Sequence, residues 1–393
     1  MPYDFDHAPD RRSTNSIKWT YYPEDVLPMW VADMDFPAPR PIIEALHAAV
    51  EHGIFGYELA SQGLRESVVG RMQKLYGWQI APESVVAIPG LVSGFFAAGA
   101  ALARPGDGYL IQPPVYMPFN DLQKQMGIVR QEAGLVAHTH GSRIHYEIDW
   151  DVFGKAFNAG GSRTRMFLLC NPHNPTGQVY TAEELGRMAE ICLKNEAVIV
   201  SDEIHSELLL GGAHHTPIAS LSPEIAKRSI TLVAPSKTFN IAGLFCGFAI
   251  VPNPELRAQY EQQLQRMTLH VNSLGLVSSL AAFSGACDEW LAELNTYLAG
   301  NRDFAVRYIE KEIPGLRSSV PDATYLLWLD CSQLVEAGKI SGSPYDFFLK
   351  EARVALNAGL PFGSGGEHFV RLNFACPRST LEEALQRMKK TLS

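Results

Sequence analysis

A single lysine follows an apolar run in the sequence LVAPSKTFNIAGL, residues 232–244. The run 230–234 stops at Pro235, and Lys237 stands next to Ser236 in a region without other basic residues. A lysine whose pKa is lowered by burial and by its neighbours is a nucleophile toward carbonyl groups. The pattern therefore predicts one buried amine, at the end of a strand, that forms a Schiff base.

Four other apolar runs of the chain also end at, or are followed by, residues that could bind a ligand. Asp202 ends the run AVIVSD, Asn174 follows RMFLLC, Tyr116 follows YLIQP, and Gly90 follows VVAIP. Ligands of open α/β sheets bind at the carboxyl ends of the strands. We therefore expect these groups to converge with the lysine in one site.

One part of this constellation suits a phosphate group. Gly90 opens the segment GLVSGFFAAGA, which is predicted to be a helix. A helix N-terminus presents free N–H groups to an anion, here those near Leu91 and Val92. The hydroxyl of Ser236 adds a further donor.

The other part suits a flat, electron-withdrawing ring. Tyr116 can stack on the ring, and Asp202 can hold the proton of a pyridinium nitrogen, which keeps the ring an electron sink. Asn174 can donate a hydrogen bond to a phenolate oxygen. Together with Lys237, these groups predict pyridoxal 5′-phosphate (PLP) as the cofactor.

The elements that position these residues are predicted to be strands of an α/β fold. Several runs are apolar on both faces, as in a mostly parallel sheet covered by helices. A capping box, Thr181 with Glu184, marks one intervening helix. The candidate strands are 85–89, 109–113, 165–170, 197–202, 230–235 and 248–252.

After about residue 275 the pattern changes to two helical stretches (276–312), two alternating stretches (325–330 and 369–375) and a last helix. This indicates a smaller α+β domain. The expected division is an N-terminal arm with part of the small domain (1–45), a large PLP-binding domain (46–275) and a C-terminal small domain (276–393).

The amino-acid composition argues against several classes of binding partner. The formal net charge of −9 argues against nucleic acid or an anionic membrane as main partner. The six cysteines are scattered without CxxC or metal-ligand spacing, so we expect reduced thiols, no metal and a cytoplasmic protein. The chain has no signal-peptide pattern and no window of 18 uninterrupted apolar residues, so no membrane span is expected.

The sequence resembles fold-type I PLP enzymes of the class I/II aminotransferase superfamily over essentially its full length. NPHNPTG (171–177), SDEIH (201–205), SKTFNIAGL (236–244) and RLNFACPR (371–378) carry this resemblance. The N-terminal segments YDFD, RRSTNSIKW and VLPMWVADMDF, and the later FGY, are similar to the MalY/PatB-like cystathionine β-lyase (C–S lyase) branch.

The resemblance implies roles for individual residues. Lys237 matches the Schiff-base lysine that also removes the Cα proton, and Arg371 matches the arginine that clamps the substrate carboxylate. Tyr57 matches a tyrosine that reaches the cofactor phosphate of the neighbouring subunit, which implies a homodimer. Ala32 lies where the N-terminal segment closes over the substrate carboxylate. His205 stands where many aminotransferases have a tyrosine beside the phenolate oxygen, and we expect it to contact the cofactor.

Two positions depart from the aminotransferase pattern. Phe245 stands where an arginine usually binds the phosphate, and Ala234 replaces a serine three residues before the lysine. A weaker hold on the phosphate is expected. Of the other histidines, His173 is expected to be structural, and His214 and His215 to be a solvated loop pair.

The resulting hypothesis is α,β-elimination from L-cystathionine or related cysteine S-conjugates to a thiol, pyruvate and ammonia. One alternative is transamination between an amino acid and a 2-oxo acid, since the same motifs serve both reactions. A second alternative is a non-catalytic regulatory binding partner. Formation of pyruvate without an added 2-oxo acid distinguishes elimination from transamination.

Overall fold

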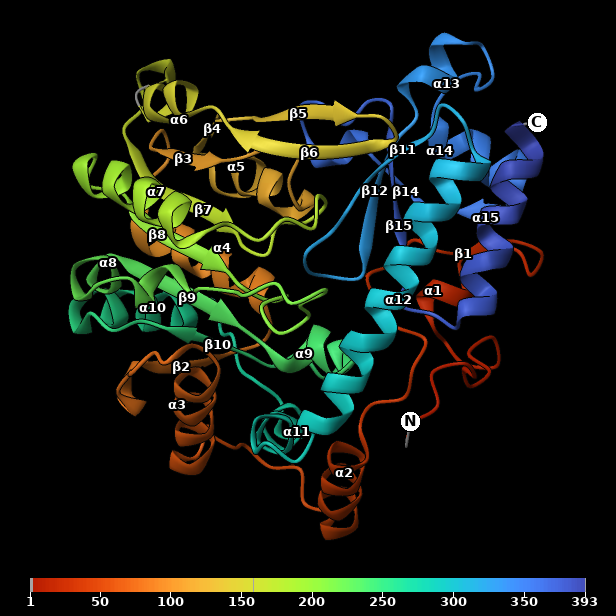
Figure 1. Cartoon of the computed structure of the whole chain (residues 1–393). Coiled ribbons are helices and arrows are strands. Elements are labelled where there is room, and N and C mark those ends of the chain that lie inside the picture. The colour runs from red at the N-terminus through yellow and green to blue at the C-terminus, as the bar shows by residue number, and fades with distance from the viewer. Residues whose placement is uncertain (1–2, 158, 393) are drawn as a thin grey trace.

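The computed structural model describes residues 3–157 and 159–392, and Figure 1 shows their arrangement around two sheets. In these residues seven strands form the larger sheet, in the order β2-β10-β9-β8-β7-β3-β4. Neighbouring strands from β9 to β4 pair in parallel, and β10 is antiparallel to β9 and β2. The bounds are β2 Val85–Ile88, β10 Gly247–Ile250, β9 Ser229–Val233, β8 Val198–Asp202, β7 Thr164–Cys170, β3 Gly108–Ile111 and β4 Val129–Glu132.

Alternate side chains of these strands enter two separate apolar clusters, one on each face of the sheet. In β7, Leu168 packs in the cluster under α4 (Leu91–Leu102) and α10 (Pro254–Arg266). Its neighbour Phe167 packs in the cluster under α6 (Trp150–Ala156) and α7 (Ala182–Lys194). Both faces are covered, which explains the uninterrupted apolar runs. The predicted capping box of α7 is confirmed.

The second sheet has the order β14-β15-β12-β11-β6-β5, and the long helix α12 (Asp288–Glu312) and α15 (Arg378–Leu392) lie along it (Figure 1). Most of its pairs are antiparallel. The α+β character predicted for the end of the chain is confirmed. The bounds are β14 Asn357–Ala358, β15 Phe369–Asn373, β12 Leu326–Asp330, β11 Arg317–Ser319, β6 Arg143–Ile148 and β5 Leu135–His140.

The hairpin β5–β6 belongs to this second sheet although it lies within the range 46–275. Ser318 and Ser319 of β11 pair in parallel with Arg143 and Ile144 of β6. Sequence alone gave no sign of this connection, because pairing partners of an edge hairpin are not encoded locally. The three-part division of the chain stays a prediction.

Residues 3–39 form an arm that lies against the second sheet. Within the arm, α1 (Ile17–Thr20) is followed by β1 (Leu27–Pro28), which pairs in parallel with β13 (Val354–Ala355). The arm leads to α2 (Arg40–His52), and an extended loop then reaches α3 (Gln62–Tyr76). The remaining helices are α5 Asp121–Met126, α8 Pro223–Lys227, α9 Pro235–Thr238, α11 Ser273–Phe283, α13 Ser332–Glu336 and α14 Pro344–Phe347.

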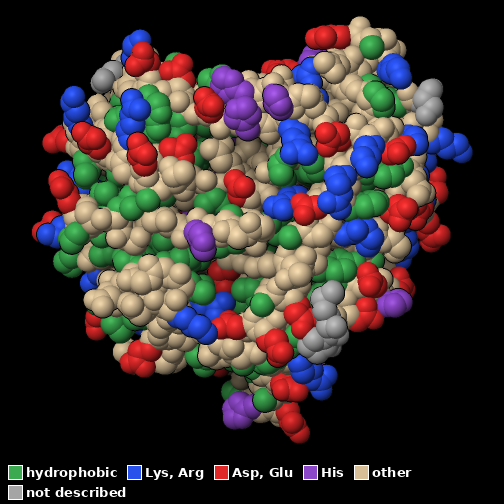
Figure 2. Space-filling view, viewed as in Figure 1, with side chains coloured by type: hydrophobic (Ala, Val, Ile, Leu, Met, Phe, Trp, Pro, Cys, Tyr) green, Lys and Arg blue, Asp and Glu red, His purple; other side chains and the backbone are tan. Residues whose placement is uncertain are grey.

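Acidic and basic side chains are interspersed over the face in Figure 2, and histidines gather at its top over the β5–β6 hairpin. The rings of His138 and His145 stack there, with centroids 5.2 Å apart. Within residues 3–157 and 159–392, no three His, Cys, Asp or Glu side chains are arranged to hold a metal ion. The same residues contain no helix long and apolar enough to cross a membrane.

Candidate active site

A cavity of about 390 Å³ lies at the carboxyl ends of the parallel strands. It brings together most of the residues singled out in the sequence. These are Ala32, Leu91, Val92, Tyr116, Asn174, Asp202, His205, Ser236 and Lys237. Two predicted residues are absent from its lining: Arg371, which borders it, and Tyr57, which lies elsewhere on the chain.

Lys237 is placed by an abrupt end of strand β9. The strand ends at Val233, and Pro235 is the first residue of the short helix α9. Proline suits that first helical position, because it has no N–H to leave unpaired. One turn later the side chain of Lys237 enters the cavity, where its Nζ donates to the carbonyl oxygen of Ala32 at 2.6 Å.

The environment of this amine favours its neutral form. Lys237 is partly exposed as a residue, but burial of its ammonium group lowers its pKa to about 8. The negative charge of Asp33 opposes this shift, the positive charge of Arg371 adds to it, and Asp202 opposes it. An amine of this kind is a nucleophile close to neutral pH.

Asp202 is the last residue of β8 and is buried. Burial raises the pKa of its carboxyl group to about 7. The N–H of Ile204, which donates to Asp202 Oδ1 at 3.2 Å, acts in the opposite direction. A protonated ring nitrogen placed against this carboxylate would supply the missing opposite charge.

His205 lies in the same loop and is buried with its Nδ1 lacking a hydrogen-bond partner. Burial lowers the pKa of its imidazole to about 3, and the charges of Lys237 and Arg371 add to this effect. The ring packs edge-on against Tyr325, with centroids 5.9 Å apart. A neutral imidazole with a free nitrogen therefore faces the cavity.

The phosphate end of the cavity is formed by the start of α4. Gly90 caps this helix with a φ of 94°, a conformation that L side chains rarely adopt, so glycine is needed there. The first N–H groups of a helix have no acceptor within it. Leu91, Val92 and Ser236 all line the same cavity.

Phe245 also lines this region, and its side chain is largely exposed. Among the described residues that line the cavity, Lys237 is the only lysine or arginine. No other cationic side chain is therefore available to bind a phosphate there. The donors that this lining offers a phosphate therefore include backbone N–H groups and the hydroxyls of Ser93 and Ser236. This set fits a phosphate held by hydrogen bonds.

Arg371 lies on β15 of the second sheet and is buried beside Asn174. Its Nη1 donates to Asn174 Oδ1 at 2.9 Å, and its Nη2 donates to Asn357 Oδ1 at 2.6 Å and to the carbonyl of Trp30 at 3.3 Å. Its Nε has no partner. Burial lowers the pKa of the guanidinium to about 10. An uncompensated buried cation of this kind suits a carboxylate ligand.

Tyr57 lies on the loop between α2 and α3 and is fully exposed. Ile54, Phe55 and Leu59 of the same loop are also largely exposed. Within this single chain, Tyr57 does not line the cavity.

Sequence reasoning missed three residues that contact the site. The hydroxyl of Tyr325 donates to the same Ala32 carbonyl as Lys237, at 3.0 Å, and Asn357 binds Arg371. Asn240, three residues after the lysine, binds the arm near Met34. Tyr325 and Asn357 lie in segments whose pattern signals only strands. Asn240 lies within SKTFNIAGL, and its place in that motif was the available signal.

One expectation for the histidines is wrong. His215 is not solvated: its buried Nε2 lies 2.8 Å from Glu203 Oε2, and Ser201 donates to the other oxygen of that carboxylate at 2.8 Å. A buried carboxylate needs such partners. His214 is exposed as expected. His173 is buried against Thr176 and the carbonyl of Gln112, in line with a structural role.

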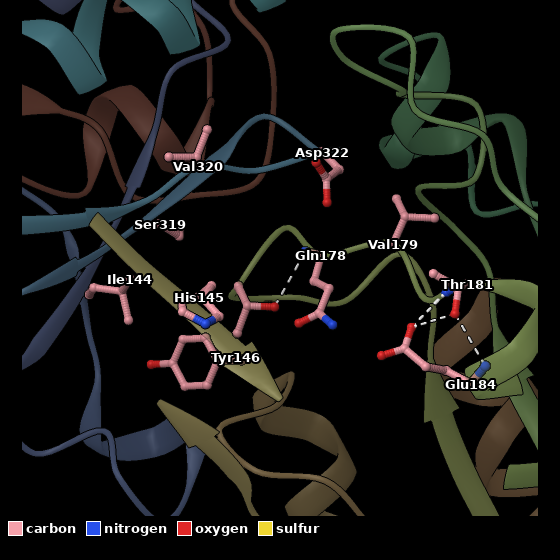
Figure 3. Close-up of a pocket in the computed structure, with 11 residues that line it drawn as sticks. Ile144, His145, Tyr146, Gln178, Val179, Thr181, Glu184, Ser319, Val320 and Asp322 are labelled. Atoms are coloured by element: carbon pink, nitrogen blue, oxygen red, sulfur yellow. Dashed lines mark hydrogen bonds between the residues drawn. The ribbon is translucent and has the colours of Figure 1, made fainter. Parts of the chain in front are cut away.

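A second cavity, of about 300 Å³, lies beside β6 and the loop before α7 (Figure 3). None of the predicted site residues lines it. The polar groups Thr181 and Glu184 at its edge bind each other in the capping box. The constellation predicted from the sequence therefore belongs to the first cavity.

Comparisons with known proteins agree with this site. The sequence profile described as "Aminotransferase class I and II" matches residues 25–388. Cystathionine β-lyase PatB of Bacillus subtilis is 40% identical over 99% of this chain and 100% of its own length. A crystal structure of a PLP-bound putative aminotransferase from Clostridium difficile superposes with a TM-score of 0.93 at 36% identity, covering 100% of both chains.

A PLP-bound C–S lyase from Staphylococcus hominis has a TM-score of 0.91 at 32% identity, covering 99% of this chain and 98% of its own. The donors at the start of α4, the buried carboxyl of Asp202 and the amine of Lys237 fit the same cofactor. The chain belongs to the class I and II aminotransferase family of PLP-dependent enzymes, in its cystathionine β-lyase (C–S lyase) branch.

Proposed function

We propose that this chain is a PLP-dependent C–S β-lyase that cleaves L-cystathionine or related cysteine S-conjugates. The products are a thiol, pyruvate and ammonia. The observation that carries the proposal is the buried amine of Lys237, with a pKa of about 8, in one cavity with Asp202 and Asn174. Relatives named cystathionine β-lyase match the full chain, at 40% and 37% identity.

The cofactor, when bound, supplies a ring that withdraws electrons from the substrate Cα. Asp202 holds the proton of its ring nitrogen, and Tyr116 stacks on the ring face. Asn174 would donate to its phenolate oxygen, and the neutral ring of His205, which lines the same cavity, would contact it. The N–H groups of Leu91 and Val92, with the hydroxyl of Ser236, bind its phosphate.

Two basic side chains have separate roles. Arg371 stays charged and binds the substrate, and Lys237, as a neutral amine, accepts a proton. Arg371 holds the α-carboxylate with its fork of N–H donors, and the arm near Ala32 covers that carboxylate. Lys237 is the amine that binds the cofactor aldehyde covalently. Its free amine would take the proton from the substrate Cα.

Loss of that proton allows the Cβ–S bond to break, and the electron pair leaves with sulfur as a thiolate. The released aminoacrylate reacts with one water molecule to give pyruvate and ammonia. Burial of Lys237 supports this role, because a lowered pKa keeps part of the amine neutral near pH 7.

We also propose that the active enzyme is a homodimer in which Tyr57 reaches the partner's phosphate site. The exposed apolar loop side chains Ile54, Phe55 and Leu59 beside Tyr57 support this assembly, since such strips mark interaction sites. We keep the divisions 1–45, 46–275 and 276–393 as the proposed domains. The free, buried state of all six cysteines supports a cytoplasmic location.

Transamination is the second candidate function. A relative named aspartate aminotransferase, from Geobacillus stearothermophilus, is 27% identical over 93% of this chain. The test is incubation of the purified holoenzyme with L-cystathionine, with and without a 2-oxo acid. Elimination predicts pyruvate in both cases. Turnover only in the presence of the 2-oxo acid would replace the lyase with an aminotransferase.

A further inference from the structure

The N-terminal arm touches both cationic groups of the site through its main chain. The carbonyl of Ala32 accepts hydrogen bonds from Lys237 Nζ at 2.6 Å and from the Tyr325 hydroxyl at 3.0 Å. Two residues earlier, the carbonyl of Trp30 accepts from Arg371 at 3.3 Å. The conformation of the segment 30–36 therefore determines the position of the Ala32 carbonyl oxygen, which accepts the hydrogen bond from Lys237.

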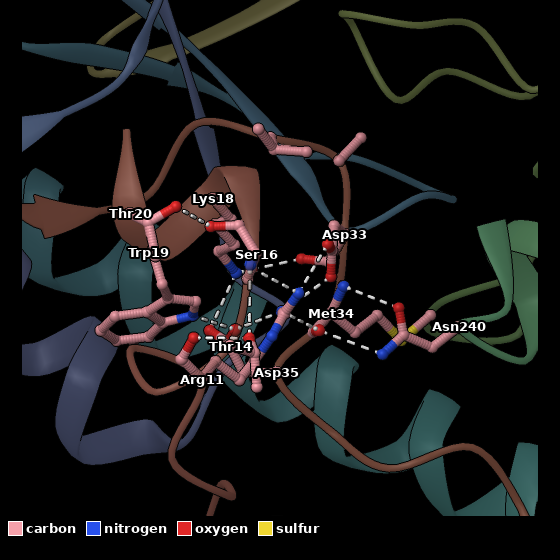
Figure 4. Close-up of polar contacts among 12 residues, drawn as sticks. Arg11, Thr14, Ser16, Lys18, Trp19, Thr20, Asp33, Met34, Asp35 and Asn240 are labelled. Carbon is pink, nitrogen blue, oxygen red and sulfur yellow. Dashed lines mark hydrogen bonds and ion pairs between the residues drawn. The ribbon is translucent and has the colours of Figure 1, made fainter. Parts of the chain in front are cut away.

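A cluster of charged side chains, Arg11, Lys18, Asp33 and Asp35, holds this segment (Figure 4). Asp35 is buried and accepts from Lys18 Nζ at 2.8 Å, Arg11 Nη1 at 2.9 Å and Trp19 Nε1 at 2.8 Å. Arg11 also binds both carboxylate oxygens of Asp33, each at 2.8 Å. Charge-assisted and bidentate bonds fix geometry more strongly than neutral ones.

Two amide side chains, of Asn240 and Asn373, also hold this segment. Asn240 accepts from the N–H of Met34 at 3.1 Å and donates to the carbonyls of Met34 and Phe36 at 3.0 and 2.7 Å. Asn373 donates to the carbonyls of Val31 and Asp33 at 2.6 and 2.8 Å. Asn240 stands three residues after the lysine, so the arm and the lysine loop are joined directly.

Stability alone is a weak reason for the buried pair Lys18–Asp35, because desolvation of two charges offsets most of their attraction. Positioning is a stronger reason, since a displacement near the reacting groups costs catalysis steeply. We propose that Asp35 is a positioning residue: with Lys18 and Arg11 it fixes the segment 31–36 so that the Ala32 carbonyl stays against the amine of Lys237. The inference rests on the proposed function for its activity readout.

The pKa of Lys237 depends on the groups around its amine. The charged and titratable groups that face its amine are Asp33 from the arm, Asp202 and His205 from the loop after β8, and Tyr325 and Arg371 from the second sheet. The Ala32 carbonyl and the Asp33 charge both favour the protonated amine. If the arm is loosened, loss of these two contacts lowers the pKa, whereas water that reaches the amine raises it, because burial is the main cause of the low pKa. A displaced arm therefore changes the pKa of Lys237.

The test compares Asp35→Asn and Asn240→Asp with Asp25→Asn. Asn240→Asp keeps the size of the side chain and suits its left-handed φ of 55°, but it loses both N–H donors to the arm. Asp25 is the matched control: it lies on the same arm and binds Arg353 at 2.7 Å on the exposed surface.

Two quantities are measured for each full-length variant. The first is kcat/KM of the holoenzyme for pyruvate release, which is expected to fall by up to roughly 100-fold in Asp35→Asn and Asn240→Asp. The second is the pH midpoint of PLP uptake by the cofactor-free chain, followed by the visible absorbance of the bound cofactor. This midpoint is expected to shift in both variants and to stay in place in Asp25→Asn.

Wild-type kcat/KM and an unmoved midpoint in Asp35→Asn would overturn the proposal. A loss of thermal stability with an unmoved midpoint would also overturn it, because the cluster would then be only structural. If Asp35→Asn does not fold, the pH midpoint of PLP uptake by Asn240→Asp tests the proposal in its place, and an unmoved midpoint overturns it. If the wild type releases no pyruvate, the proposed function fails, and the midpoints still decide whether the arm positions Lys237.

Discussion

Arg371 and Asn174 lie 197 positions apart in the sequence, and Nη1 of Arg371 donates to the amide oxygen of Asn174 at 2.9 Å. Because this bond engages the oxygen, the amide nitrogen of Asn174 is the atom left to donate toward the cofactor ring. The residue proposed to hold the substrate carboxylate thus orients the residue proposed to hold the cofactor. This contact joins the second sheet to the loop after β7.

Replacement of Arg371 by lysine is expected to raise KM for the amino-acid substrate. Lysine keeps the charge but lacks the planar fork that binds a carboxylate through two parallel bonds. Loss of one charged hydrogen bond, about 1.5–3 kcal/mol, corresponds to an increase in KM of roughly 10- to 150-fold. Steady-state kinetics of pyruvate release measures this change.

Arg353→Lys is the matched control, because Arg353 forms a bidentate pair with Asp25 on the exposed surface. Its KM is expected to equal that of the wild type. If Arg371→Lys also keeps the wild-type KM, the carboxylate is bound by another group.

Uptake of PLP by the cofactor-free chain is expected to depend on pH through Lys237. Only the neutral amine attacks an aldehyde, and burial lowers the pKa of Lys237 to about 8. The uptake rate should therefore rise with pH through about 8 and then level off. Stopped-flow absorbance measures the rate. A rise that continues to the ordinary lysine pKa of about 10.4 would show that the amine is not buried as described.

His215→Ala is expected to destabilise the fold, whereas His214→Ala is not. Removal of the His215 ring leaves one buried oxygen of Glu203 without its partner, at a cost of about 1–3 kcal/mol. His214 is exposed and serves as the neighbouring control. Urea denaturation gives the free energy of unfolding of each variant. Equal stabilities would mean that water replaces the ring at Glu203.

A mixture of two weak variants is expected to recover activity if Tyr57 acts across a dimer. Lys237→Ala lacks the reactive amine, and Tyr57→Ala lacks the side chain proposed to reach the partner's phosphate site. In a mixed dimer, one site combines the intact lysine of one chain with the intact tyrosine of the other. Activity after joint refolding should exceed that of either variant refolded alone. An inactive mixture of dimers would place Tyr57 outside the active site.

The sequence predicted the site well where residues follow a strand directly. Lys237, Asp202 and Asn174 each come within a few residues of an apolar run, and the carboxyl ends of parallel strands meet at one edge. The six candidate strands were found because both faces of the sheet are buried, which makes each strand uniformly apolar.

Contacts between distant segments were not predictable in the same way. The hairpin β5–β6 joins the second sheet through pairing with β11, and its own residues do not encode that partner. Tyr325, just before β12, and Asn357, in β14, contact the site, but neither lies in a motif that marks it as a site residue. His215 was mistaken for a solvated residue because its partner Glu203 lies twelve positions away, across the segment 204–214.

The most direct test of the central claim is the stoichiometry of product release from an S-substituted L-cysteine, with purified holoenzyme and no 2-oxo acid. Thiol and pyruvate are measured together over several turnovers. The account predicts equal amounts of both from the wild type and neither from Lys237→Ala. Thiol and pyruvate absent from the wild type, with turnover only after addition of a 2-oxo acid, would contradict it.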